Sequence, residues 1–192
     1  MGIVRRRFDA SEDTVSFLEL MELLFIRQFR HEEVSLQTIR TAAVVASRKF
    51  KTDYPFAVKK FDTDGKTIFG TLVKQVKDGE QEVIEDLQHG QYVFKQIVKP
   101  FFRKLEYGEQ EALRYWPLFK KGRVVLDPER QFGQPIDAVT GVPTQALSDA
   151  VCAGDGQDVA AVAKWFDVPP RAVEQAILFE QSPACSISST VA

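Results

Sequence analysis

The stretch VVLDPERQFGQPIDAVTGVPTQALSDAVCAGDGQDVAAVAKWFDVPPRAVEQAILFE, residues 124–180, decides the fold expected for this chain. Its later part places small and bulky apolar residues where two helices joined by a tight turn must pack. Asp167 takes the turn position that glycine usually holds, and Pro169 and Pro170 can open the second helix, whose first turn leaves backbone donors unpaired. This spacing predicts a helix-turn-helix-like binding module. The packing residues are Val162, Ala163, Phe166, Val168, Val173 and Ala176.

The outer face of the second predicted helix carries one cation and one anion. Its residues are Arg171, Glu174, Gln175 and Leu178. DNA binding draws most of its affinity from Lys and Arg that neutralise phosphates, so this face is weakly equipped for DNA. Docking of a protein is the favoured interpretation, and base reading is the alternative.

The residues upstream of this module predict short strands and one more helix. Residues 123–126 should form a strand, residues 132–142 a pair of short strands or turns, and Pro143 should start a helix that stops near Gly154. Irregular strands leave open edges, and a second copy of the domain could pair with them. The pattern therefore predicts a homodimer.

The N-terminal part predicts two helices. Ser16 and Glu19 form a capping box, so a helix should run from there to about Arg30. Apolar residues wrap most of its circumference, which indicates burial on several sides, by the core or by a second subunit. Ser35 should cap the next helix. The basic residues left facing outward are Arg27, Arg30, Arg40, Arg48 and Lys49.

The middle of the chain predicts a hairpin and a third helix. KKFDTDGKTIFG, residues 59–70, has a DG turn between apolar and β-branched residues, which is typical of a β-hairpin. The aspartates lack the spacing of a calcium loop. A helix is expected over residues 91–107, kinked or divided at Pro100.

These elements predict an α+β, mostly helical fold of two domains. Residues 1–107 should form the helical domain with its hairpin, 108–122 a linker, 123–180 the strand-plus-three-helix module, and 181–192 a disordered tail. With 192 residues, of which 44% are apolar and 27% charged, the chain can bury one sizeable core or two modest ones.

Charge is unevenly distributed along a chain whose net charge is -2. Residues 1–60 hold eleven Lys and Arg against eight Asp and Glu, residues 61–122 hold ten of each, and residues 123–192 hold four against nine. Any nucleic acid that binds should therefore contact the N-terminal part of the chain. The DNA-binding candidates are Arg5, Arg6, Arg7 and Arg40. A solvated, disordered terminus is the alternative interpretation of the three adjacent arginines.

Other function classes find little support in the residues. No apolar run reaches membrane-spanning length, and acid rather than an apolar stretch follows the N-terminal arginines, which predicts a cytoplasmic protein. Two cysteines and two scattered histidines are too few for a zinc site. No arrangement of nucleophile and base stands out, so we expect neither an enzyme nor a cofactor.

Two stretches carry a resemblance to a known family. Residues 17–40, FLELMELLFIRQFRHEEVSLQTIR, resemble the later helices of a MerR-like domain, and residues 124–180 are similar to a small antitoxin-associated domain of unknown function. The chain departs from that domain at Asp155 and Gly156, where Glu-Ser is usual. The matching positions are Gly133, Pro135, Thr140, Gly141, Pro143, Thr144, Ala153 and Gly154. Together the stretches look like VapB-type antitoxins, whose toxins are PIN-domain ribonucleases.

This resemblance implies an antitoxin that covers its toxin's active site and can regulate its own operon through DNA. MerR-like domains read DNA with helices ahead of the one that here begins at Ser16, where too few residues remain for two helices. Clustered carboxylates in the toxin would favour a cation and an apolar anchor. The partner-binding candidates are Arg130, Trp165, Arg171, Glu174, Gln175 and Phe179, although both aromatics could instead be core residues. Alternative functions are a transcriptional regulator without a toxin, and a scaffold.

Overall fold

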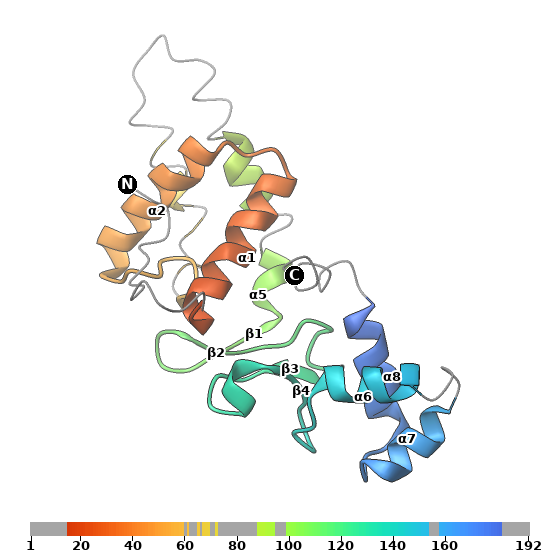
Figure 1. Ribbon diagram of the computed structural model, residues 1–192. Coiled ribbons are helices and arrows are strands. Elements are labelled where there is room, and N and C mark those ends of the chain that lie inside the picture. Colours follow the sequence, from red (N-terminus) through yellow and green to blue (C-terminus); the bar gives the residue numbers. More distant parts are fainter. Residues whose placement is uncertain are drawn as a thin grey trace. The chain divides into compact units, whose positions relative to one another are not determined.

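A computed structural model of the chain describes residues 15–59, 61, 65, 67–69, 72, 88–94, 99–153 and 158–181 (Figure 1). The chain divides into two compact units, which are described separately. The first unit comprises residues 1–103 and 107–112, and the second comprises residues 104–106 and 113–192. No helix in the described part of the chain is long and apolar enough to cross a membrane.

The first unit begins with helices α1 (Phe17–His31) and α2 (Leu36–Phe50). The predicted capping box is confirmed: the Ser16 hydroxyl accepts the Glu19 N–H, and the Glu19 carboxylate accepts the Ser16 N–H at 2.9 Å. The Ser35 hydroxyl accepts the Thr38 N–H at 3.1 Å and caps α2. All five cations that were expected to face outward are exposed.

Tilted and edge-on pairs of phenylalanines form the core of the first unit. Phe25 of α1 lies 4.6 Å from Phe101 and 6.4 Å from Phe61 between ring centroids, and both pairs meet edge to face. Aromatic pairs in this geometry stabilise the core beyond the area that they bury, by about 1 kcal/mol each. The fully buried phenylalanines are Phe25, Phe29, Phe56, Phe61 and Phe69.

The predicted hairpin over residues 59–70 is wrong, because the described residues of this stretch are helical. Phe61, Gly65, Ile68 and Leu72 recur at helical spacing and are buried. A Cβ atom on Gly65 would lie 2.4 Å from Cε2 of Phe94. The glycine thus permits close packing against an aromatic ring and does not form a turn.

The third predicted helix ends earlier than expected. Residues 88–94 are helical, α5 spans Lys99–Phe102, and residues 95–98 lie outside the described residues. Pro100 stands in the first turn of α5, where its missing N–H is tolerated. Strand β1 (Leu105–Tyr107) follows, so the prediction of helix to residue 107 is wrong. The range 108–122, expected as a linker, contains strand β2 (Ala112–Tyr115).

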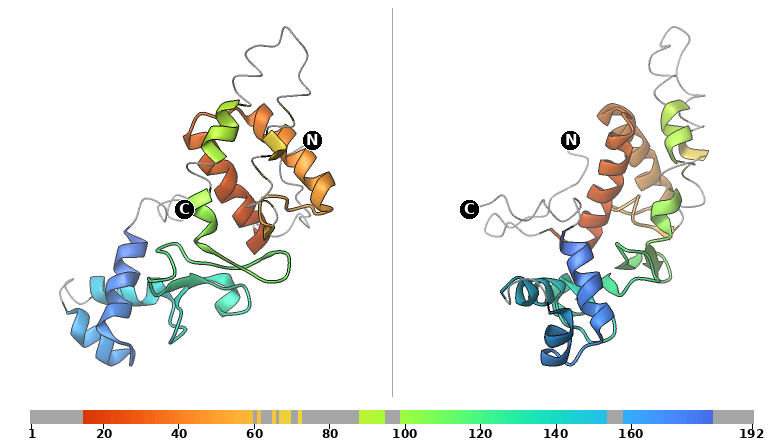
Figure 2. Two further views of the ribbon diagram at one scale, coloured as in Figure 1. Left: turned by 180° about the vertical axis from the view of Figure 1, so that it is seen from behind. Right: turned by 90° about the vertical axis from the view of Figure 1, so that its right-hand side faces the viewer.

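A small sheet with the order β1-β2-β3-β4 leads into the second unit's helices. The predicted strand at 123–126 is confirmed as β3 (Val124–Leu126), which pairs antiparallel with β4 (Pro135–Asp137), Val125 facing Ile136. A 3₁₀ helix, η2 (Gln131–Gly133), lies between them. The helices that follow are α6 (Thr144–Ala153), α7 (Val159–Trp165) and α8 (Pro170–Glu180), shown together in blue tones in Figure 2.

Candidate interaction surfaces

Helices α6, α7 and α8 enclose a core of small and β-branched side chains. Five of the six predicted packing residues are buried, and Phe166 is half-buried against them. Asp167 adopts a φ of 53° in the connection between α7 and α8, as its turn position required. The buried cluster consists of Leu147, Val151, Val162, Ala163, Val168, Ala172, Val173 and Ala176. Because this core is complete without the outer side chains of α7 and α8, those side chains are available for contacts with another molecule.

The outer surface of α7 and α8 exposes two large apolar side chains. Trp165 is 80% exposed and Leu178 is 56% exposed. Arg171 and Glu174 are also exposed on α8, and Gln175 is half-buried beside them. We call Trp165, Arg171, Glu174 and Leu178 the α7–α8 surface. It combines apolar area with one charge of each sign.

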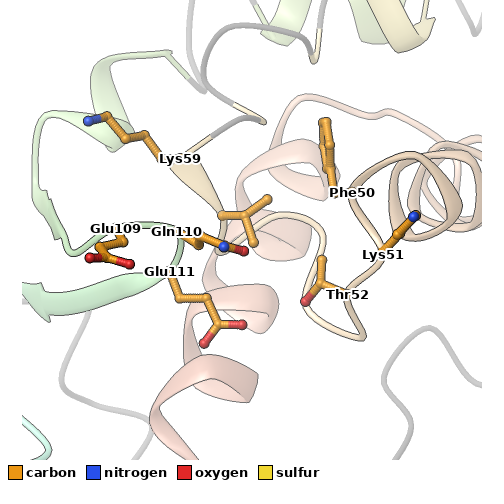
Figure 3. A pocket seen from close by; sticks show the side chains of 8 residues that line it. Phe50, Lys51, Thr52, Lys59, Glu109, Gln110 and Glu111 are labelled. Carbon is orange, nitrogen blue, oxygen red and sulfur yellow. The ribbon is translucent and has the colours of Figure 1, made fainter.

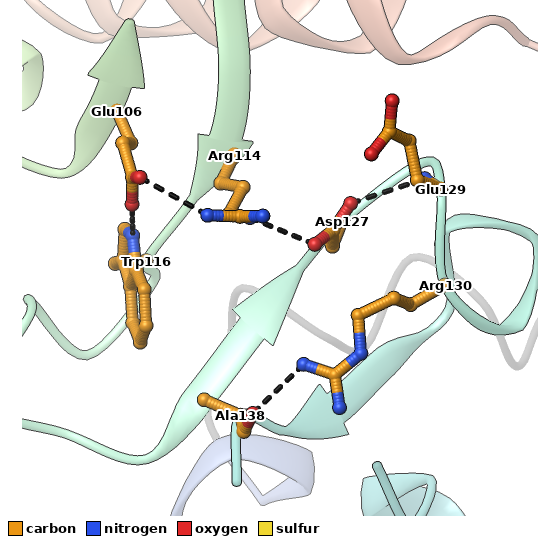
Figure 4. Close-up of polar contacts among 7 residues, drawn as sticks. All are labelled: Glu106, Arg114, Trp116, Asp127, Glu129, Arg130 and Ala138. Carbon is orange, nitrogen blue, oxygen red and sulfur yellow. Dashed lines mark hydrogen bonds and ion pairs between the residues drawn. The ribbon is translucent and has the colours of Figure 1, made fainter.

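Two of the predicted partner-binding residues lie elsewhere. Phe179 is only 8% exposed and belongs to the core, so it does not offer an apolar anchor at the surface. Arg130 is half-buried, and its Nη1 donates a hydrogen bond of 2.7 Å to the Ala138 carbonyl (Figure 4). That guanidinium bridges the loops on either side of β4. The loops carry two exposed apolar side chains, Phe132 and Val139.

The ends of α6 and α8 are tied together. The Thr144 hydroxyl lies 2.5 Å from a carboxylate oxygen of Glu180 and 3.3 Å from the carbonyl of Pro135. Thr144 opens α6 and Glu180 closes α8. A carboxylate at a helix N-terminus is stabilised by the free backbone N–H groups there. This contact holds the C-terminal end of α8 against the start of α6.

Buried acids on the sheet are neutralised by arginines. Asp127 is 2% exposed and accepts a 2.7 Å hydrogen bond from Arg114, which also contacts Glu106 at 3.1 Å; Trp116 donates to Glu106 (Figure 4). Hydrogen bonding and charge attraction to Asp127 raise the pKa of the Arg114 guanidinium. This network joins three strands or strand ends and is satisfied internally, so we interpret it as structural.

Arg123 and Asp137 form a second pair across β3 and β4. Arg123 donates to both carboxylate oxygens, at 2.6 and 2.8 Å, and Thr140 donates from its N–H and its hydroxyl. Burial alone would raise the pKa of Asp137, but the hydrogen bonds from Arg123 and Thr140 outweigh it and lower that pKa. Sequence reasoning singled out none of these acids. The available signal was their position at strand ends next to arginines on neighbouring strands.

The predicted DNA-binding residues divide into two groups. Arg40 is exposed on α2. Arg5, Arg6 and Arg7 lie outside the described residues. The structure therefore places one of the four candidates on a helix, and a basic N-terminal arm formed by the three adjacent arginines stays a prediction.

The first unit also contains a cavity of about 390 Å³ beside the C-terminal end of α2 (Figure 3). The N–H of Lys59 donates 2.9 Å to the carbonyl of Gln110, which joins the two walls. The lining residues are Phe50, Lys51, Thr52, Val58, Lys59, Glu109, Gln110 and Glu111. Cations and acids are balanced around it, so charge selects no ligand class.

A buried acid of the first unit, Glu22, is bound by backbone N–H groups. Glu22 of α1 is 2% exposed, and its Oε1 accepts the N–H groups of Phe56 and Ala57 at 2.6 and 2.9 Å. Burial raises the pKa of Glu22 to about 8, although the two backbone hydrogen bonds act in the opposite direction. Glu22 fixes the segment after α2 against α1. Among the described residues, no group of three or more His, Cys, Asp or Glu side chains could hold a metal ion.

Comparison with known proteins gives a relative and a shared fold. No model of a known protein family matches the chain. The chain is 27% identical over 176 residues to a protein of Mycobacterium tuberculosis (strain ATCC 25618 / H37Rv) named "Putative antitoxin VapB45", over 87% of this chain and 72% of that protein. The crystal structure of Rv2018 from Mycobacterium tuberculosis matches with a TM-score of 0.70 and 22% identity, covering 85% of this chain and 78% of that one. The chain thus shares the fold of Rv2018 and is similar, over most of its length, to a protein that carries an antitoxin name.

Proposed function

We propose that the chain is the antitoxin of a toxin–antitoxin pair and neutralises a PIN-domain ribonuclease in the cytoplasm by binding it directly. The observation that carries this proposal is Trp165, which is 80% exposed beside a core that is complete without it. Similarity to a protein named as an antitoxin supports the same function. The proposed role is non-catalytic and requires no cofactor.

The α7–α8 surface has the chemistry of a protein contact. Tryptophan and arginine are enriched among the residues that dominate binding energy, and large apolar side chains supply most of the area that is removed from water. Arg171, Glu174 and Leu178 recur at helical spacing on α8. In the proposed complex, Arg171 approaches the clustered carboxylates of the toxin and Trp165 fills an apolar pocket beside them.

The test is co-expression with the ribonuclease-like protein encoded in the neighbouring reading frame. The full chain should restore growth and bind the toxin. Trp165→Ala should weaken binding by about 30-fold or more, the effect expected for a tryptophan that dominates an interface. Phe132→Ala is the matched control, because Phe132 is a fully exposed aromatic of the same unit outside the proposed surface. Equal binding by the wild type and Trp165→Ala would refute the surface.

A chain ending at Glu180 should also restore growth. Residues 181–192 contain no Lys or Arg, so they supply no cation for the toxin's carboxylates. Loss of rescue in a shortened chain that keeps its fold would assign inhibition to the tail.

We further propose that the chain acts as a homodimer through α1. Leu23 is exposed, and Leu18, Leu20, Leu24 and Ile26 are only half-buried, which leaves apolar area that a second copy would cover. Light scattering at micromolar concentration should give twice the mass of one chain.

The second candidate function is a DNA-binding transcriptional regulator without a toxin partner. The observation that favours it is α2, which carries Arg40, Arg48 and Lys49 and no acidic residue. Binding to operator DNA belongs to both functions, since an antitoxin can repress its own operon. A toxin-binding measurement distinguishes the two functions, because only an antitoxin binds a toxin.

A further inference from the structure

Two pairs of helices in this chain are joined by connections of the same construction. Residues 32–35 join α1 to α2, and residues 166–169 join α7 to α8. Each connection has an acidic residue with positive φ at its second position, Glu33 at 63° and Asp167 at 53°. A buried valine, Val34 or Val168, follows directly.

The hydrogen bonds of the two connections also correspond. The N–H of Val34 donates to the carbonyl of Phe29 at 3.2 Å, and the N–H of Val168 donates to that of Ala163 at 2.9 Å, five residues back in both cases. This pattern closes a helix with a left-handed residue and redirects the chain into the next helix. A connection of three or four residues between two helices is typical of DNA-binding helix-turn-helix units, in which the second helix enters the major groove.

The second helices differ in what they present to solvent. Residues Gln37, Arg40, Thr41, Val44 and Arg48 of α2 are all exposed and recur at i, i+3, i+4, i+7 and i+11, so they form one stripe. We call them the α2 stripe. The opposite face of α2, including Ile39, Ala43 and Ala46, is buried. No acidic residue occurs in residues 35–51, and the nearest acids in the chain, Glu33 and Asp53, lie beyond the two ends of the helix.

The α2 stripe has the donor, acceptor and methyl groups that read base pairs. Arginine donates two hydrogen bonds to guanine, glutamine pairs with adenine, and a methyl group of threonine or valine contacts thymine. Arg40 and Arg48 make no ion pair or hydrogen bond with any described residue. Val44 is apolar but 44% exposed. A single exposed valine costs little free energy in water, and its methyl groups could contact thymine methyl groups in the major groove.

We propose that α1, the connection 32–35 and α2 form a helix-turn-helix that binds double-stranded DNA, with the α2 stripe in the major groove. This inference rests on the operator-binding part of the proposed function and assigns it to a surface other than the N-terminal arm. The 15 residues of α2 span about 22 Å, and the major groove of B-DNA admits an α-helix. Double-stranded RNA does not fit, because its deep major groove is too narrow for the same approach.

The first experiment measures binding of the full chain to a two-turn DNA duplex taken from directly upstream of its own reading frame, across a range of salt. Arg40→Ala with Arg48→Ala should weaken binding on the order of 50-fold at 0.1 M salt and reduce the salt slope by roughly 2, since each cation removed from the DNA surface lowers the number of released counterions by about one. The matched control removes two exposed cations of the other unit that belong to no proposed surface, Lys120→Ala with Lys121→Ala. The control should leave affinity and slope unchanged.

The second experiment separates base reading from charge. Gln37→Ala should leave the salt slope as in the wild type and reduce the preference for the upstream duplex over a shuffled one by about 10-fold. Arg40→Lys with Arg48→Lys keeps the charges, so it should retain the slope while losing preference. Circular dichroism confirms that each variant keeps its helices.

Several outcomes would overturn the proposal. They are absence of duplex binding by the wild type, an unchanged slope in the double alanine variant, an equal loss in the control, and equally effective competition by an RNA duplex. Toxin neutralisation is measured on the same variants. Rescue by the Arg40 and Arg48 variants is expected to be normal, so failure of this inference and failure of the antitoxin proposal give different results.

Discussion

The connections α1–α2 and α7–α8 have nearly the same backbone conformation, but the helices that follow them expose different residues. Both turn on a left-handed acidic residue and a buried valine. The exposed stripe of α2 is basic and free of acid, whereas α8 presents Arg171, Glu174 and Leu178, with no net charge. The comparison teaches that the turn is set by a few buried or strained positions. What the second helix binds is set by exposed positions that the turn leaves unconstrained.

The largest expected effect comes from placing a charge at the buried valine of either connection. Val34→Asp and Val168→Asp should each cost more than about 4 kcal/mol of the free energy of unfolding, because an unpaired carboxylate is buried. Val44→Asp and Val139→Asp are exposed controls and should change stability by less than about 0.5 kcal/mol. Hydrogen exchange reports each unit, and fluorescence of Trp116 and Trp165 reports the second. A tolerated Asp at Val34 alone would show that the two connections are not equivalent.

A pH titration should separate the units by the sign of its effect. Glu22 has a pKa of about 8 in the folded chain and 4.5 as its ordinary value, so the unfolded state releases its proton first. The contribution of Glu22 to the stability of the first unit is therefore greatest below pH 4.5 and falls as pH rises to 8, by up to about 1.4 kcal/mol per pH unit. Glu22→Gln should abolish this slope and still accept the N–H groups of Phe56 and Ala57.

Asp137 in the second unit should show the opposite dependence. Its pKa is lowered below 3.8, so the stability that it contributes is present above that pH and is lost as pH falls further. Tryptophan fluorescence during acid titration follows this unit. If the wild type and the Asp137→Asn variant lost stability equally as the pH fell, the assignment of this pH dependence to Asp137 would be contradicted.

The smallest expected effect concerns the left-handed residues. Glycine tolerates positive φ without the cost of a Cβ, so Glu33→Gly and Asp167→Gly should stabilise their units or leave them unchanged, within about 1 kcal/mol. Aspartate tolerates this region better than glutamate, so Glu33→Gly should gain more. Chemical denaturation measures both. A loss of stability in Glu33→Gly would show that the Glu33 side chain contributes contacts of its own.

Local sequence signals correctly predicted several helix starts and one strand. Caps at Ser16 and Ser35, the strand at 123–126 and the helix after Pro143 depend on hydrogen bonds and apolar spacing within a few residues. The hairpin prediction failed at Gly65, because this glycine is needed for close packing against the ring of Phe94, nearly thirty residues away in the sequence. Strand β1 was missed for a related reason: its three residues are extended because β2 pairs with them.

The candidate surfaces were only partly predictable. Arg40, Arg171 and Glu174 were correctly expected to be exposed, because helical spacing alone fixes which side faces the core. The alternatives for the two aromatics were resolved by packing: Trp165 faces solvent and Phe179 faces the core. Glu22 was overlooked although it stands in an apolar helix, since its partners are backbone groups after α2.

The sequence by itself determined where helices begin, where the acidic turn residues fall, and that residues 35–51 contain no acidic residue. These properties depend on neighbours within a turn or two, so residue type and spacing are sufficient. Tertiary structure alone decided that Gly65 packs in a helix, that Asp127 and Asp137 are neutralised by arginines, and that the connection at Glu33 repeats the one at Asp167. Those properties depend on contacts between distant segments and on backbone angles that emerge only when the core is packed.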